Sequence, residues 1–210
     1  MDTYPETFAV YQMHVSDPPY NTAWADQRRL FYGNISDGIP WFAYDGLWDA
    51  WPISTYETKL NQRQAVPTDV TIELYGTESG VQTYDILARV CIEPGGVDKT
   101  MRVYMVEALD HWPASPSYER NTCRQGATTE DVVVTAGSCA AVTRTFTFDA
   151  ISWAQQDDIR IVAWAQTPAV LYPGEVHQAR VMAWPFTPYT AIFTDDFELG
   201  NTSAWSGTTP

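Results

Sequence analysis

Hydrophobic and polar positions follow two different patterns in this chain, and the change falls at Val66-Pro67. Beyond it, apolar and polar residues alternate with a period of two, which is typical of strands with one buried face. Seven such segments are separated by turn residues and have no helical pattern between them: 69–75, 82–92, 100–110, 131–135, 142–148, 159–166 and 176–184. Residues 111–130 are predicted to be a long loop. We therefore expect residues 66–190 to form an antiparallel, immunoglobulin-like β-sandwich.

The part before Val66 has a mixed pattern. The apolar run 8–15 predicts a buried strand, and residues 22–32 predict a helix with Asn21 or Thr22 as its N-cap. Within that helix, Trp24, Arg28 and Phe31 have the spacing of one helical face. The order of strand, helix and strand is the unit from which parallel or mixed sheets are built.

A second group of elements follows Gly33, which ends the predicted helix. Residues 41–44 and 47–53 are predicted strands, and Asp45-Gly46 is a turn signal that would join them as an antiparallel pair. Residues 55–64 are polar and predict a short, final helix.

The segment Gly38–Gly46, GIPWFAYDG, together with the strand and helix before it, resembles the second half of a thioredoxin-like domain. The chain resembles a group of secreted or outer-membrane bacterial proteins that join such a domain to an immunoglobulin-like sandwich. The resemblance implies an α+β fold, with a truncated thioredoxin-like domain over 1–65. It also makes Pro40 the candidate cis proline; the bland alternative is a trans proline that opens a strand. The redox Cys-x-x-Cys of that family would precede Phe8, and only seven residues stand there.

The three cysteines favour an exported protein. Cys123 and Cys139 flank a short segment between apolar runs, so we predict a disulfide between them. Cys91 lies within a strand pattern, and we expect it to be a free, buried thiol. No cysteine pair has Cys-x-x-Cys spacing, and no Cys/His group has the spacing of a zinc site.

Charge and composition exclude several classes of function. The net charge of −14 leaves no basic face for nucleic acid, and no run of 18 apolar residues is present to span a membrane. Catalytic motifs are absent, and the acidic pairs lack the spacing of a calcium loop. We expect no catalytic residue, no metal and no cofactor, and a location outside the cell or on the outer surface of a bacterium.

Nine tryptophans raise the question of sugar binding. Trp41, Trp48 and Trp51 are the candidates for a glycan platform, although packing between the two domains is the simpler interpretation. For Trp153, Trp164 and Trp184, which lie in or beside apolar strands, we expect core packing.

The last segment, 191–210, resembles short C-terminal extensions of exported bacterial proteins, with Asp-x-Phe-Glu-x-Gly followed by Ser-Ala-Trp-Ser. A domain without its leading strand would leave an open sheet edge, and open edges accept strands from other chains. We therefore expect self-association through this segment. The residues expected to anchor it are Ile192, Phe193, Phe197 and Trp205.

Three hypotheses of function follow. The first is a non-enzymatic extracellular structural or interaction protein that assembles into a filament or surface layer. The second is a thiol-disulfide oxidoreductase that lacks its N-terminal redox segment. The third is a secreted glycan-binding module. A strict monomer would contradict the first hypothesis, the absence of an upstream Cys-x-x-Cys the second, and buried rings at the three tryptophans the third.

Overall fold

The structure is a computed structural model that describes residues 9–14, 20–33, 42–50, 55–112 and 120–189. Pro40, Trp41 and Trp51 lie outside these ranges, as does the whole segment 191–210 with its four predicted anchors. Trp48 belongs to a described strand, but its side chain is not described. The cis peptide bonds of the described residues precede Pro173 and Pro185.

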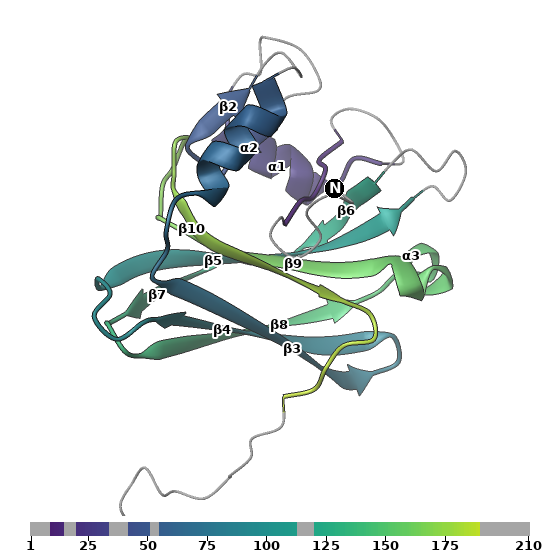
Figure 1. Cartoon of the computed structure of the whole chain (residues 1–210). Helices are drawn as coiled ribbons and strands as arrows, with labels where there is room; N and C mark the ends of the chain where they lie inside the picture. Colours follow the sequence, from purple (N-terminus) through teal and green to yellow (C-terminus); the bar gives the residue numbers. More distant parts are fainter. Residues whose placement is uncertain (1–8, 15–19, 34–41, 51–54, 113–119, 190–210) are drawn as a thin grey trace, which may run out of the picture.

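Two antiparallel sheets make up most of the molecule (Figure 1). The larger sheet has the order β10-β9-β5-β6, and β7 also pairs with β5. Its strands are β5 (Lys99–His111), β6 (Arg120–Gly126), β7 (Glu130–Val134), β9 (Ile159–Gln166) and β10 (Val176–Ala183). The smaller sheet has the order β3-β4-β8, with β3 (Val70–Gly80), β4 (Thr83–Ile92) and β8 (Cys139–Thr147).

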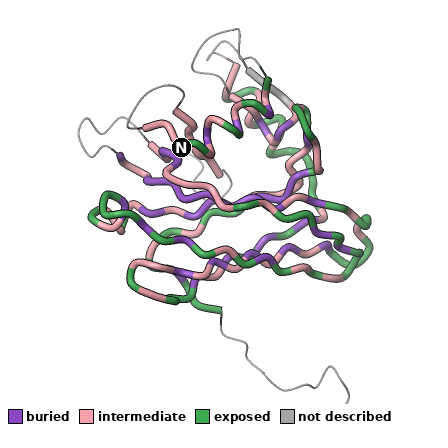
Figure 2. The backbone as a smooth tube through the Cα atoms, turned by 180° about the vertical axis from the view of Figure 1, so that it is seen from behind, coloured by how far each residue is buried: buried purple, intermediate pink, exposed green. Residues whose placement is uncertain are grey.

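The two sheets share one hydrophobic core, which the alternating pattern predicts. In β4 every second residue from Tyr84 to Ile92 is buried, and the core residues of β5 include Met101, Val103 and Met105. Figure 2 shows buried and exposed positions alternating along the strands. Each fully buried aliphatic side chain contributes about 1.5–3 kcal/mol to stability, so this core is the main source of the fold's stability.

The larger sheet is covered on its other face as well. Helix α1 (Ala23–Phe31), the hairpin β1 (Phe42–Tyr44) and β2 (Trp48–Ala50), and helix α2 (Tyr56–Gln64) lie on the side away from the smaller sheet (Figure 1). A second cluster of buried residues fills this outer interface: Tyr104, Val106, Cys123, Val162 and Trp164. Strand β9 is therefore buried on both faces along most of its length, which explains its nearly continuous apolar sequence.

The strands predicted beyond Val66 are confirmed, and two elements of that part were missed. All seven predicted strands beyond Val66 are present, but the predicted loop 111–130 contains β6. The β6 sequence, RNTCRQG, has one apolar residue, so its alternation carries no strand signal. The short helix α3 (Ala150–Ala154) was not predicted either; it begins where the Asp149 carboxylate accepts a hydrogen bond from the Ser152 N–H at 2.8 Å.

Both predicted helices of the N-terminal part are confirmed, and Thr22 is the N-cap of α1. The predicted strand 8–15 is wrong within the described residues 9–14, where Gln12 forms a single parallel bridge to Thr122. Next to this bridge Asn121 has a φ of 54°, so β6 is not extended at that residue. The observed class is a β-rich α+β fold, and the thioredoxin-like and immunoglobulin-like assignments stay predictions.

The disulfide prediction is wrong. Cys91 and Cys139 form the bond, and Cys123 is the free, buried cysteine. The register of β4 and β8 places Cys91 directly opposite Cys139, with their Cα atoms 4.0 Å apart, on the outer face of the smaller sheet. Cys123 belongs to β6, and its side chain lies in the second cluster, on the larger sheet. Spacing along the chain could not reveal this pairing, because it depends on a register between strands 48 residues apart.

None of the described helices is both long enough and apolar enough to cross a membrane.

We predict that the double variant Cys91→Ser/Cys139→Ser loses about 2–4 kcal/mol of unfolding free energy, because the bond closes a long loop in the unfolded chain. Urea denaturation of both proteins measures the loss. Peptide mapping without reductant should show the linked peptides of Cys91 and Cys139, and a thiol reagent should label Cys123 only after unfolding. A linked peptide that contains Cys123 would contradict the assignment.

Candidate binding site

Helix α1 positions the candidate site on the outer face of the larger sheet. The Thr22 Oγ1 accepts a hydrogen bond from the Ala25 N–H at 3.1 Å and begins the helix. The helical spacing then directs Trp24, Arg28 and Phe31 toward the sheet, and Arg28 is only 6% exposed. The predicted helical face is thus confirmed, although its sequence was not recognised as a site.

An aromatic stack forms the floor beneath the helix. The Trp164 ring lies between Tyr104, at a centroid distance of 4.8 Å and an angle of 2°, and Tyr11, at 5.0 Å and 17°. Trp24 meets the edge of this stack, 6.3 Å from Trp164 and nearly perpendicular to it. Gly126 of β6 makes room for Trp24, because a Cβ atom there would overlap the indole ring. The stack gives the site rigid, flat apolar surfaces.

The Arg28 side chain lies between the helix and the aromatic stack and joins the helix to the sheet. Its guanidinium donates hydrogen bonds to the Tyr104 hydroxyl at 3.1 Å, the Tyr32 hydroxyl at 3.2 Å and the Gln166 Oε1 at 2.6 Å. It also lies over the rings of Phe31 and Tyr104, at 4.2 and 4.5 Å. Within the described part of the chain, no carboxylate lies within ion-pair distance of this buried cation.

The protonation of Arg28 is preserved by its neighbours. Burial alone would lower the pKa of Arg28, but the surrounding tyrosine hydroxyls outweigh that effect, and the pKa is raised. Burial in turn raises the pKa of Tyr11 well above its ordinary value. Arg28 therefore keeps its positive charge in the buried site, and a buried cation favours an anion beside it.

Gln166 connects the site to the loop that follows β9. Its Oε1 accepts from Arg28 and from the Trp164 Nε1–H at 3.3 Å, and its Nε2 donates to the Gly174 carbonyl at 2.6 Å. The Phe31 carbonyl accepts a hydrogen bond from the Tyr172 N–H at 2.7 Å. Helix, strand and loop are thus joined by hydrogen bonds around one buried amide.

The β1–β2 turn holds the same loop from its other side. Asp45 and Gly46 both have positive φ, as the predicted Asp-Gly turn requires. The Gly46 carbonyl accepts from the Gly174 N–H at 2.9 Å, and the Asp45 carbonyl accepts from the Val176 N–H at 2.7 Å. The two glycines approach so closely that a Cβ on Gly46 would meet the Gly174 carbonyl.

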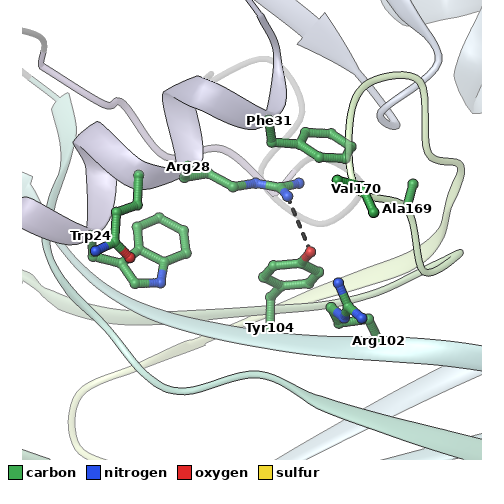
Figure 3. Close-up of a pocket in the computed structure, with 8 residues that line it drawn as sticks. Trp24, Arg28, Phe31, Arg102, Tyr104, Ala169 and Val170 are labelled. Atoms are coloured by element: carbon green, nitrogen blue, oxygen red, sulfur yellow. Dashed lines mark hydrogen bonds between the residues drawn. The ribbon is translucent and has the colours of Figure 1, made fainter.

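A surface pocket of about 360 Å³ opens between α1, β5 and this loop (Figure 3). Its lining consists of Trp24, Gln27, Arg28, Phe31, Arg102, Tyr104, Ala169 and Val170. Val170 stands at the rim and is 91% exposed. Leu30 and Leu171, which neighbour lining residues in the chain, are exposed as well. The pocket thus combines aromatic walls, a cation and an apolar rim.

The two arginines of the pocket differ in their partners. The Asp131 carboxylate accepts from Arg102 Nε at 2.6 Å and from Arg102 Nη2 at 2.8 Å. Hydrogen bonding to Arg102 lowers the pKa of Asp131, so the pair is charged and mutually neutralised at neutral pH. Among the described residues, Arg28 has no such carboxylate partner, and it is the uncompensated charge of that part of the site.

The tryptophan predictions have mixed outcomes. Trp164 is buried, and Trp153 and Trp184 are partly buried against the core, as expected. The proposed glycan platform stays a prediction, because its rings are not described. The aromatic surface that the structure does show uses Trp24 and Tyr104 instead. The signal for it was an arginine on the apolar face of a helix, where a charge requires a partner.

A second group of charged residues lies at the far end of β5. Asp110, His111 and Asp158 have possible ligand atoms within 4.8 Å of one another. Asp110, however, accepts from Arg120 at 2.9 Å and from Arg160 at 3.4 Å. These arginines occupy the carboxylate, so the group is accounted for by ion pairs.

Glu107 is a buried acid inside the main core, away from the pocket. Its Oε2 accepts from the Gln125 Nε2 at 2.5 Å, and 1% of the residue is exposed. Burial raises the pKa of the Glu107 carboxyl above its ordinary value. Folding therefore favours its protonated form.

No protein-family model and no curated protein sequence matches this chain. Among solved structures, HBP35 of Porphyromonas gingivalis aligns with a TM-score of 0.60 and 10% identity, over 81% of this chain and 61% of that one. A domain of the outer membrane lipoprotein Omp28 from P. gingivalis aligns with a TM-score of 0.42 and 14% identity, over 58% and 99% of the two chains. A Bifidobacterium adolescentis GH3 beta-glucosidase aligns with a TM-score of 0.31 and 17% identity, over 55% of this chain and 17% of that one.

The HBP35 comparison shows a shared fold, and this chain spans less than two thirds of that protein. At 10% identity the likeness carries nothing about activity. The other two alignments are too weak to support any argument.

We predict that Gly126→Ala displaces Trp24 and loosens α1, because the new methyl group overlaps the indole. Overpacking of this kind costs about 1–3 kcal/mol. Hydrogen exchange should accelerate in α1 while the amides of β3 and β4 keep their protection. Gly80→Ala is the control, since its Cβ would make only ordinary contacts with Thr83. Unchanged exchange in α1 would contradict the packing described here.

We predict that Glu107→Gln stabilises the protein increasingly as pH rises. Between the ordinary glutamate pKa of about 4.3 and the raised value, the folded wild type holds more protons than the unfolded chain, so its stability falls with rising pH. The glutamine variant lacks this loss. Urea denaturation from pH 4 to pH 8 measures the difference, with Glu93→Gln as an exposed control. Parallel curves for wild type and Glu107→Gln would contradict the prediction.

Proposed function

We propose that this chain is a non-enzymatic, exported binding protein of a bacterium, and that its pocket binds a carboxylate joined to a flat apolar group. The observation that carries the proposal is the buried Arg28, a cation without a carboxylate partner among the described residues that lines an open pocket.

The energetics of burial support an anionic ligand. A buried charge is costly unless it is paired and hydrogen-bonded. Arg28 has five N–H donors, and three hydrogen bonds to Tyr104, Tyr32 and Gln166 are made by its two terminal nitrogens. All of these partners are neutral. A ligand carboxylate at the pocket would supply the missing opposite charge.

The walls of the pocket support an apolar, flat neighbour to that carboxylate. The Trp24, Phe31 and Tyr104 rings line it, and stacking on such rings contributes roughly 0.5–1.5 kcal/mol beyond burial. Binding sites of this kind combine apolar walls with a few placed polar groups.

Export is supported by the disulfide between Cys91 and Cys139, since such bonds persist in oxidising compartments. We propose that the exported protein is located on the bacterial surface. Burial raises the pKa of Cys123 to about 12, which suppresses its thiolate, so the redox alternative would depend on a Cys-x-x-Cys upstream of Phe8 and not on this cysteine.

A structural role is one form of the same binding function. In it, copies would join through residues 191–210 into a filament or surface layer. Glycan binding at Trp41, Trp48 and Trp51 is the alternative, and it requires rings other than those of the pocket.

We predict that the protein binds aryl carboxylates about tenfold or more tightly than their amides, because a hydrogen bond to a charged group contributes about 1.5–3 kcal/mol. Benzoate, phenylacetate and indole-3-acetate, each with its matching amide, form the test panel. Titration calorimetry measures the affinities. Val170→Asp should weaken carboxylate binding by placing a negative charge at the rim, whereas Val81→Asp, at a site 87% exposed and on the β3–β4 turn, should not.

Equal affinity for acids and amides, or no binding across the panel, would reject the pocket as an anion site. Chemical shift or fluorescence changes confined to Trp residues outside α1 and β9 would place the ligand elsewhere.

A further inference from the structure

We propose that the partner bound by this pocket is the acidic, aromatic segment 191–210 of a second copy of this chain. The inference rests on the proposed function, which it makes specific: the carboxylate and the flat group belong to one protein segment. The contact it describes joins two copies head to tail.

The composition of the segment matches the chemistry of the pocket. Residues 191–210 carry Asp195, Asp196 and Glu198 and no lysine or arginine. Phe197 stands between two of these acids, so one short stretch offers a ring with a carboxylate on each adjacent residue. The pocket offers ring faces beside an uncompensated guanidinium. Alternate residues of an extended chain share a side, so we assign the Phe197 ring to the aromatic walls and the carboxylate of Asp195, two residues before it, to Arg28.

The rim of the pocket adds an apolar surface for the rest of the segment. Val170, Leu171 and Leu30 are all exposed, and Val170 lines the pocket directly. The segment has Ile192 and Phe193 four to five residues before Phe197. An extended chain covers about 3.3 Å per residue, so these side chains can cover apolar surface up to about 13–17 Å from the bound ring.

The position of the segment's start favours a second copy over the same chain. The Thr187 carbonyl accepts a hydrogen bond from the Gly76 N–H at 2.8 Å, and Tyr189 packs on Tyr75 of β3 at 5.1 Å. The described chain therefore ends on the smaller sheet, whereas α1 and the pocket lie beyond the larger sheet (Figure 1). To reach its own pocket, the segment would have to pass around both layers.

A contact between pocket and segment uses different surfaces on the two copies. Such a heterologous contact leaves one free pocket and one free segment at every stage, so it extends into open chains unless rotation closes a ring. In a protein of net charge −14, the buried cation Arg28 is a local positive charge that an acidic segment can pair with.

The test uses two full-length variants that damage opposite halves of the contact. Val170→Asp adds a negative charge at the pocket rim, and Phe197→Ala removes the ring of the segment. Sedimentation velocity over about 1 µM to 1 mM should show growing assemblies for wild type and for the control Val81→Asp. Each damaged variant alone should associate at least about tenfold more weakly.

Mixing the two damaged variants provides the decisive measurement. The Phe197→Ala copy keeps an intact pocket, and the Val170→Asp copy keeps an intact segment, so an equimolar mixture should form a dimer and nothing larger. A wild type that stays monomeric over the whole range, a mixture without the dimer, or a Val81→Asp control that fails to assemble would each overturn the proposal.

The carboxylate panel separates this inference from the proposed function. If wild type is monomeric but binds aryl carboxylates in the pocket, the binding function stands and the second copy is not the partner. If a monomer also fails to bind the panel, both proposals are rejected. If a synthetic peptide of residues 191–210 dissolves the assemblies and its Phe197→Ala form does not, the proposal is supported.

Discussion

The packing of α1 and of the loop after β9 on the larger sheet depends on the hydrogen bond between Arg28 and Gln166. This hydrogen bond buries a charge from α1 against the last residue of β9, 138 residues away in the chain. Gln166 also donates a hydrogen bond to the Gly174 carbonyl of the loop after β9. The β1–β2 turn accepts a hydrogen bond from the same loop. The pocket exists because these elements meet around one buried polar pair, since a buried arginine must have hydrogen-bond partners wherever the helix places it.

The larger sheet packs against other elements on both of its faces. Its inner face packs on the smaller sheet, and its outer face packs on α1 and the aromatic stack. The inner contact is aliphatic and supplies most of the stability. The outer contact consists of rings, one arginine and one amide, which give defined geometry but less buried aliphatic area. This division places the aromatic stack and its buried arginine on the outer side, where the pocket opens.

The features that were predicted correctly are those with a local physical cause. The period of two along Tyr84–Ile92 follows from alternating side chains on a strand with one buried face. The cap at Thr22 and the turn at Asp45-Gly46 depend on a few neighbouring residues. The features that were missed lack such a signal: β6 has a single apolar residue, Cys123, so its sequence shows no alternation, and α3 is only five residues long.

The amino-acid sequence by itself determined most of the strands and helices, the face of α1 and the acidic charge of the chain, because each depends on short-range patterns or on composition. The tertiary structure decided which cysteines pair and which side chains surround Arg28. Cys91 meets Cys139 through the register of two strands, and Trp24, Tyr104 and Trp164 meet through the packing of a helix on a sheet. Both results depend on distances in space between residues far apart in the chain, which no spacing along the sequence encodes.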